Sequence, residues 1–278
     1  MFHRPTFFKE IRASVFRGKF SQKQVDGLNV LLDVWERDYS DKPYQWLAAA
    51  LGTAYHETAH TMQPIREYGK GRGRKYGRPD PKTGKVYYGR GYVQLTWKFN
   101  YEKASRELGF DFVNNPDLVM VPEHAARILF QGSNEGWFTG KGWKDYIDDR
   151  IEADQEDLRE YANSRRVING TDRQVLIGGY NLSFDRALKA ARIAYKAGKK
   201  DEPVEVTGKN PLKSTTNIAA AVTGAAAVAS NVDTVKDTIG GVSGLIGIDP
   251  KWILLAVALA AGAWIISERI KKSRNDGV

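Results

Sequence analysis

A short stretch at residues 55–61, Tyr-His-Glu-Thr-Ala-His-Thr, contains side chains that could carry out a reaction. Two histidines one helical turn apart, with a glutamate between them, can bind zinc and supply a base, as in zinc peptidases. A glutamate that follows an apolar helical run can instead act as a proton donor without any metal. The sequence therefore offers two interpretations of Glu57.

The zinc interpretation needs a third protein ligand, and the sequence does not mark one. In the extended zinc-peptidase pattern a glycine and a third histidine would follow, but Gln63 and Arg66 stand at those positions. The histidines of the chain are His3, His56, His60 and His124. We therefore predict no metal site and no other cofactor, with a zinc peptidase as an alternative.

Two further motifs are longer and more specific. Residues 87–101 read YYGRGYVQLTWKFNY, and residues 164–170 read SRRVING. Together with His-Glu-Thr at residues 56–58, they resemble the motifs of glycoside hydrolase family 19, in the same order. This family contains chitinases and related cell-wall lysozymes of phages and bacteria. The resemblance covers roughly residues 20–195.

The resemblance implies the catalytic roles. Glycosidic bond hydrolysis needs one carboxylic acid to protonate the leaving oxygen and one carboxylate to act on the attacking water. By resemblance, Glu57 is the general acid and Glu67 the general base of an inverting mechanism, with Asp80 as the second choice for the base. Thr96 is expected to orient the water. A base on a loop allows the separation of roughly 6.5–9.5 Å between carboxyl groups that inversion requires.

The resemblance also implies contacts with the sugar. Amide side chains supply a donor and an acceptor without charge, which suits sugar hydroxyls and acetamido groups. For each amide, a structural role in a cap or turn is an equally good interpretation. One of Arg165 and Arg166 is expected to pair with a carboxylate of the cleft. The predicted substrate-binding residues are Tyr88, Gln94, Asn100, Asn169 and Arg166.

The elements that must position these groups are mainly helical. Apolar spacing predicts helices at about 21–38, 41–59, 94–108, 122–133, 145–163 and 172–197. Ser21 is the expected N-cap of the first of them. The glycine-rich and cationic residues 69–91 predict a long loop, with a minor β-hairpin around residues 80–88. The helices indicate a mainly α catalytic domain over residues 1–200, and the resemblance implies that it is lysozyme-like, with a cleft between two lobes.

The charge of the chain bears on the substrate. The net charge is +9, and the loop after Glu67 carries Lys70, Arg72, Arg74, Lys75 and Arg78. Neutral chitin offers these cations nothing to bind, whereas peptidoglycan carries carboxylates. The predicted function is therefore hydrolysis of peptidoglycan strands in the manner of a phage endolysin, with a chitinase as an alternative. The sequence has no nucleic-acid-binding motif and no cysteine, and it does not indicate an oligomeric state.

The C-terminal part differs in composition from the rest. Residues 201–217 are predicted to be a linker, residues 218–248 are rich in alanine and glycine, and residues 249–278 are predicted to form a membrane anchor with a basic tail. Residues 252–267 carry no charge and include tryptophans that suit a membrane interface. This run is shorter than the usual span of about 20 residues, so a buried helix is the alternative.

The predicted anchor suggests a location. The positive-inside rule would place the basic tail in the cytoplasm and the catalytic domain in the periplasm of a bacterial host, at the inner membrane. A place in a virion is the alternative location. The N-terminus shows no signal-peptide pattern, so this topology would require another export route. A function of a different class, a catalytically silent membrane-anchored wall-binding protein, is also consistent with the sequence.

Overall fold

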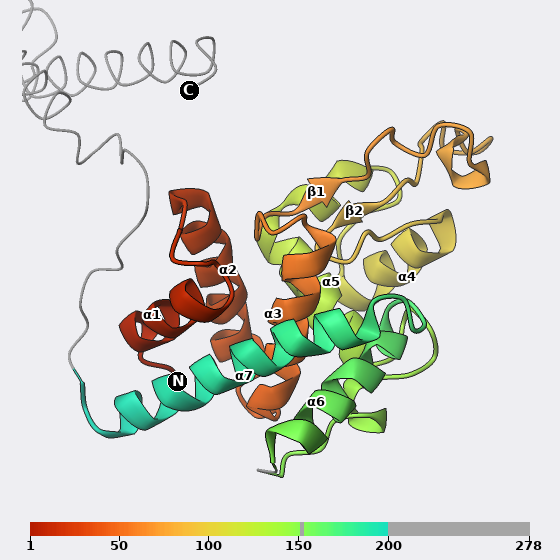
Figure 1. Cartoon of the computed structure of the whole chain (residues 1–278). Helices are drawn as coiled ribbons and strands as arrows, with labels where there is room; N and C mark the ends of the chain where they lie inside the picture. The colour runs from red at the N-terminus through yellow and green to blue at the C-terminus, as the bar shows by residue number, and fades with distance from the viewer. Residues whose placement is uncertain (151–152, 200–278) are drawn as a thin grey trace, which may run out of the picture. The chain divides into compact units, whose positions relative to one another are not determined.

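The structure is a computed structural model that describes residues 1–150 and 153–199 (Figure 1). Two short strands are present, β1 (Ile65–Arg66) and β2 (Arg90–Gly91). The α-helices are α1 (Arg4–Ser14), α2 (Gln22–Asp38), α3 (Tyr44–Glu57), α4 (Lys98–Leu108), α5 (Pro122–Asn134), α6 (Asp154–Asn163) and α7 (Gln174–Lys196). Short 3₁₀ turns lie at Lys75–Gly77, Pro116–Met120, Trp143–Asp145 and Ser164–Val167. The predicted fold class, mainly α with a minor β element, is confirmed for the described residues.

The helix starts show which sequence signals were informative. Ser21 caps α2 as predicted, in a capping box with Gln24. The helix predicted at 145–163 is wrong over its first half, because α6 begins only at Asp154. The sequence did not predict α1, although His3 accepts a hydrogen bond from the Thr6 amide and a proline lies in the first turn. This helix buries Phe7, Phe8 and Ile11 in the core.

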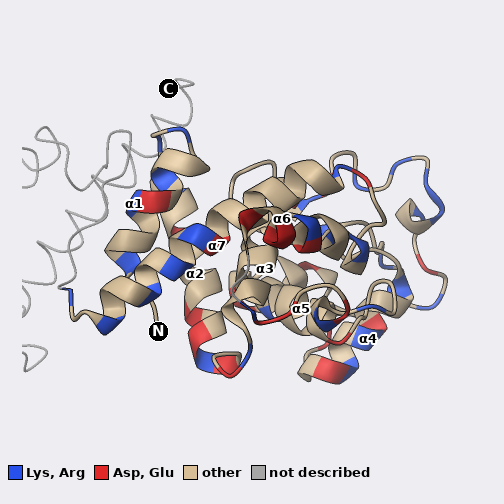
Figure 2. Cartoon of the chain, turned by 60° about the horizontal axis from the view of Figure 1, so that its bottom comes forward, with Lys and Arg blue, Asp and Glu red and all other residues tan. Residues whose placement is uncertain are grey.

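Helix α3 lies between two groups of elements, with α1 and α2 on one side and the strands and α4 on the other (Figures 1 and 2). Helix α7 packs against α3, α6 and α1. A Cβ atom at Gly52 of α3 would lie 2.0 Å from Asn181 Oδ1 on α7, so only glycine permits this close crossing. The crossing fixes the C-terminal half of α3 against the first half of α7.

The strands join the two ends of the long loop. They pair antiparallel, with Ile65 opposite Gly91 and Arg66 opposite Arg90. The hairpin predicted around residues 80–88 is therefore wrong in position. In the predicted hairpin segment, Tyr87 is 3% exposed, and its hydroxyl donates to the Val113 carbonyl, so this segment packs against the core without forming a strand pair.

The remaining domain predictions lie outside the described residues. These are the linker at 201–217, the segment at 218–248, and the anchor and tail at 249–278 with the apolar run 252–267. Within residues 1–150 and 153–199, none of the helices combines the length and apolar character needed to cross a membrane.

Candidate functional site

Glu57 is the last residue of α3, and the next residue ends the helix. The Thr58 hydroxyl donates to the Ala54 carbonyl at 2.7 Å and accepts from the Met62 amide at 3.1 Å. These bonds redirect the chain through left-handed backbone at Ala59 and His60. The side chain of Glu57 is thus held at the end of a buried helix, where its exposed fraction is 17%.

The Glu57 carboxyl pairs with a buried arginine. Arg165 Nη1 donates to Glu57 Oε1 at 2.6 Å, and its side chain is 2% exposed. Arg165 comes from the 3₁₀ turn before α7, where its Nε donates to the Asp172 carbonyl at 3.3 Å. Among the described residues, Glu57 Oε2 has no hydrogen-bond partner. One oxygen therefore orients the carboxyl, and the other can reach a substrate.

We expect Arg165→Gln to impair both stability and turnover. Removal of one member of a buried ion pair leaves an unpaired charge and destabilises the fold by about 3 kcal/mol. The carboxyl of Glu57 would also lose its orientation, so kcat should fall much more than KM rises. Urea unfolding and steady-state kinetics measure these effects. A rise in KM with an unchanged kcat would show that Arg165 binds substrate and does not position Glu57.

Glu67 lies directly after β1, opposite Gly89. The Glu67 amide donates to the Gly89 carbonyl at 2.7 Å, and the Gly89 amide donates to Glu67 Oε2 at 3.1 Å. A Cβ at residue 89 would lie 2.9 Å from Gln94 Oε1 and 3.3 Å from the Glu67 Cβ, so a larger residue would displace both side chains. The first glycine of the Gly-Arg-Gly motif therefore serves to place Glu67.

The second oxygen of Glu67 also has a partner. The Tyr76 hydroxyl donates to Glu67 Oε1 at 2.8 Å, and this bond raises the pKa of Tyr76. The ring of Tyr76 packs edge-on against Trp97, with ring centroids 5.3 Å apart. Tyr76 belongs to the long loop, so this loop and the motif at 87–101 together fix the orientation of Glu67. Sequence reasoning did not identify Tyr76, because no motif contains it.

Three predicted residues are connected in series beside the strands. Gln94 Nε2 donates to the Ile65 carbonyl at 3.2 Å, and the Thr96 hydroxyl donates to the Gln94 carbonyl at 2.6 Å. Asn100 Nδ2 donates to the Thr96 carbonyl at 2.8 Å. Each amide nitrogen is thus used inside the protein. Within residues 1–150 and 153–199, Gln94 Oε1 and Asn100 Oδ1 accept no hydrogen bond, so both oxygens can accept one from a sugar.

Tyr88 is buried beside Arg90. Its exposed fraction is 7%, and the Arg90 guanidinium lies 3.6 Å from the centre of its ring. Arg90 also pairs with Asp117 at 2.8 Å and donates to the Tyr101 hydroxyl at 3.0 Å. These contacts give Tyr88 a packing role behind β2, and its contact with sugar stays a prediction.

Of the two adjacent arginines, Arg165 is the one that meets a predicted catalytic carboxyl. Arg166 Nη1 donates to Asn163 Oδ1 at 2.6 Å, and its carbonyl accepts from the Thr139 hydroxyl at 2.8 Å. Asn169 is exposed, and its backbone N–H donates to the Arg165 carbonyl. Sugar contacts of Arg166 and Asn169 stay predictions.

Asp80, the second choice for the base, is held by hydrogen bonds within the long loop. Its Oδ1 accepts from Lys98 Nζ at 3.0 Å, from the Lys82 amide at 3.1 Å, and from both the amide and the hydroxyl of Thr83. The hydrogen bond from Lys98 lowers the pKa of Asp80 to about 2. Such a carboxylate is a poor proton acceptor near neutral pH. Asp80 therefore stabilises the loop, and the assignment of Glu67 as the base stays a prediction.

The geometry does not support the zinc interpretation of HETAH. Because α3 ends at Glu57, His56 and His60 do not lie one turn apart on a helix. The His60 backbone is left-handed, with φ 67°, and its ring stacks on Tyr55 with centroids 4.1 Å apart. His60 therefore belongs to an aromatic cluster on a different side of α3 from the Glu57–Arg165 pair.

Comparison with known proteins gives one family match and several relatives. Residues 45–180 match the family model of glycoside hydrolase family 19, described as chitinase class I. The acidic endochitinase of Petunia hybrida is 37% identical over 106 residues, which cover 38% of this chain and 40% of that protein. The inactive chitinase-like protein 1 of Hevea brasiliensis is 37% identical over 83 residues, 28% of this chain and 21% of that protein. The matched stretch thus spans two fifths of the first relative's length and about one fifth of the second's.

Among solved structures, chitinase C from Streptomyces griseus is similar, with 22% sequence identity and a TM-score of 0.43. The likeness covers 66% of this chain and 76% of that one.

Proposed function

We propose that this protein hydrolyses the β-1,4 bond between N-acetylated amino sugars, because its residues 45–180 match the model of glycoside hydrolase family 19. The observation that carries the proposal is the carboxyl of Glu57. One of its oxygens is fixed by a buried arginine, and the other has no hydrogen-bond partner among the described residues. A positioned acid of this kind is what departure of a sugar oxygen requires.

In the proposed reaction, Glu57 donates a proton from Oε2 to the glycosidic oxygen as the bond from that oxygen to C1 breaks. Glu67 takes a proton from a water molecule, which attacks C1 from the opposite face of the ring. The products are an alcohol on one sugar and a new reducing end of inverted configuration on the other. Thr96 orients the water, while Gln94 and Asn100 accept hydrogen bonds from the acetamido groups or hydroxyls.

Chitin-type polymers are the first candidate substrate. Relatives that match the chain include proteins named endochitinase and chitinase, beside the inactive chitinase-like protein 1. The acceptor oxygens beside Glu67 suit the N–H of an acetamido group, which every sugar of chitin carries. Neither feature depends on the charge of the polymer.

Peptidoglycan is the second candidate, and the long loop favours it. Figure 2 shows this loop as the run of blue segments at the right of the molecule. Its cations are exposed, and within the described part of the chain none of them forms an ion pair. Unpaired cations on one loop attract a polymer that carries carboxylates. These cations are Lys70, Arg72, Arg74, Lys75 and Arg78.

Parallel assays of the full chain test the proposal. We expect new reducing ends from a chitin oligosaccharide, with the α-anomer as the first product by proton NMR. If peptidoglycan is also cleaved, added salt should lower that rate more than the rate on the neutral oligosaccharide, because salt screens the loop cations. A β-anomer as the first product would refute inversion. No new reducing ends from either polymer would favour a silent binding protein.

A further inference from the structure

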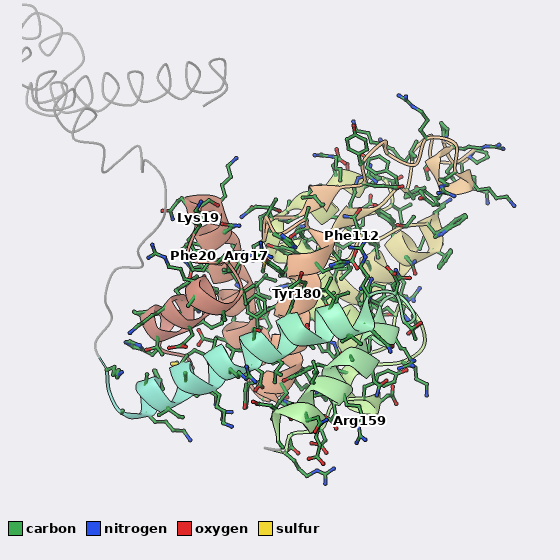
Figure 3. The ribbon with its side chains drawn as sticks, viewed as in Figure 1. Arg17, Lys19, Phe20, Phe112, Arg159 and Tyr180 are labelled. Atoms are coloured by element: carbon green, nitrogen blue, oxygen red, sulfur yellow. The ribbon has the colours of Figure 1, made fainter. Side chains whose placement is uncertain are left out.

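A cavity of about 630 Å³ lies beside the end of α3, away from the Glu57 carboxyl. It is bounded by the turn between α1 and α2, by the end of α3, and by α7. Figure 3 shows Arg17, Lys19 and Phe20 on the first of these segments and Tyr180 on the last. Tyr55 lines the cavity and stands two positions before Glu57, which places the two side chains about 200° apart around the helix. The cavity and the proposed acid therefore occupy different faces of one helix end.

The wall of the cavity is aromatic. The His60 ring stacks on Tyr55, and Phe16 meets Tyr55 edge-on with centroids 5.1 Å apart. Tyr180 contacts the same ring edge-on at 4.9 Å. Aromatic walls in pockets of this size commonly hold the apolar face of a compact ligand such as a sugar ring. The cavity is therefore large enough and suitably lined for one monosaccharide.

The rim of the cavity is cationic. Arg17 and Lys19 are exposed, and within residues 1–150 and 153–199 neither forms an ion pair or a side-chain hydrogen bond. Burial lowers the pKa of His60, and the charge of Arg17 lowers it further. No aspartate or glutamate is among the lining residues. The cavity thus combines positive charge at its mouth with an apolar wall.

The backbone of this region is held in uncommon conformations. Arg17 has φ 51°, and His60 has φ 67°, although neither is a glycine. Left-handed backbone is strained at residues other than glycine and is found preferentially at binding and active sites. Gln24 supports the second position, because its Nε2 donates to the His60 carbonyl at 2.9 Å. The shape of the cavity is therefore fixed by two strained turns.

We propose that this cavity binds an amino sugar that carries a carboxylate, with the sugar ring against His60 and Tyr180 and the carboxylate at Arg17 and Lys19. The choice of an N-acetylated sugar as the ligand rests on the proposed function. The glycan that binds here therefore carries an acidic substituent on some of its sugars. The cavity then provides a contact that neutral chitin cannot make, on the same helix end as the catalytic acid.

The test compares two sugars that differ in the acidic substituent. N-acetylmuramic acid has a carboxylate on a lactyl ether, and N-acetylglucosamine lacks it. Their affinities for the full chain are measured by ligand-observed NMR. We expect the acidic sugar to bind about tenfold more tightly, the effect of two partly exposed ion pairs. Equal affinity for the two sugars would overturn the proposal.

Variants locate the binding. The double substitution Arg17→Gln with Lys19→Gln should abolish the preference for the acidic sugar, and Lys19→Gln alone should reduce it. Lys9→Gln is the matched control, because Lys9 is an exposed cation of α1 that does not line the cavity. Circular dichroism checks that each variant is folded. An unchanged preference in the double variant, or its loss in Lys9→Gln, would contradict the assignment.

Failure of this inference can be told apart from failure of the proposed function. The sugar preference is measured by binding, so it should persist in Glu57→Gln protein, in which hydrolysis is expected to be lost. If the wild-type chain cleaves chitin oligosaccharide but shows no preference for the acidic sugar, the proposed function is supported and the cavity assignment is wrong. If the chain prefers the acidic sugar but cleaves no glycan, the cavity assignment is supported and the proposed function is wrong.

Discussion

Glu57→Gln is expected to reduce glycan hydrolysis by roughly 10²–10⁴-fold, the usual contribution of a general acid. The amide oxygen can still accept the hydrogen bond from Arg165, so the local geometry should persist. The amide cannot donate the proton that the leaving oxygen requires. The release of reducing ends from a chitin oligosaccharide measures the loss, and thermal unfolding shows whether the fold is retained.

His60→Ala is the informative companion to this variant. His60 contributes its ring to the aromatic cluster around Tyr55, on a different side of α3 from the carboxyl. We expect this substitution to leave much more activity than Glu57→Gln. If His60→Ala abolished hydrolysis while Glu57→Gln did not, the assignment of Glu57 as the acid would be wrong, and the zinc interpretation would have to be reconsidered.

Glu67→Gln is expected to have the second-largest effect, also by orders of magnitude. An amide cannot take the proton of the attacking water, so the water remains a weak nucleophile. The oxygen of the new amide can still accept a hydrogen bond from the Tyr76 hydroxyl or from the Gly89 amide, so the side chain should stay in place. Steady-state kinetics on the same oligosaccharide measure the loss, which should appear as a lower kcat.

Tyr76→Phe separates the charge of Glu67 from its placement. This variant removes one hydrogen bond to the carboxylate but keeps the ring that packs against Trp97. We expect a loss of activity much smaller than in Glu67→Gln. If Tyr76→Phe were as severe as Glu67→Gln, the hydroxyl of Tyr76 would take a direct part in the reaction. If Glu67→Gln were fully active, Glu67 would not be the base.

The family motif singled out Glu57, whereas the apolar spacing extended the predicted helix to residue 59, two residues beyond the end of α3. The motif at 87–101 located the segment that holds Glu67, and its first glycine has a clear steric reason. The choice between Arg165 and Arg166 could not be made from sequence. Two identical neighbours differ only in the direction in which the 3₁₀ turn points them.

Other features depend on contacts between distant parts of the chain. Tyr88 is an aromatic residue that suits a sugar cleft, but it is buried beneath Arg90, which pairs with Asp117 of a separate segment. The aromatic cavity likewise combines Phe16, Tyr55 and Tyr180, which lie on three different elements. Helix α1 has a modest sequence pattern and is stabilised mainly by burial of its phenylalanines.

The most direct test of the account is the identity of the bond that is broken. A chitin oligosaccharide is incubated with the full chain in water enriched in heavy oxygen, and the products are analysed by mass spectrometry. We predict shorter oligosaccharides with one heavy oxygen at each new reducing end, formed far more slowly by the Glu57→Gln variant. Shorter products without the label at the reducing end, or equal cleavage by the Glu57→Gln variant, would contradict hydrolysis of a glycosidic bond with Glu57 as the acid.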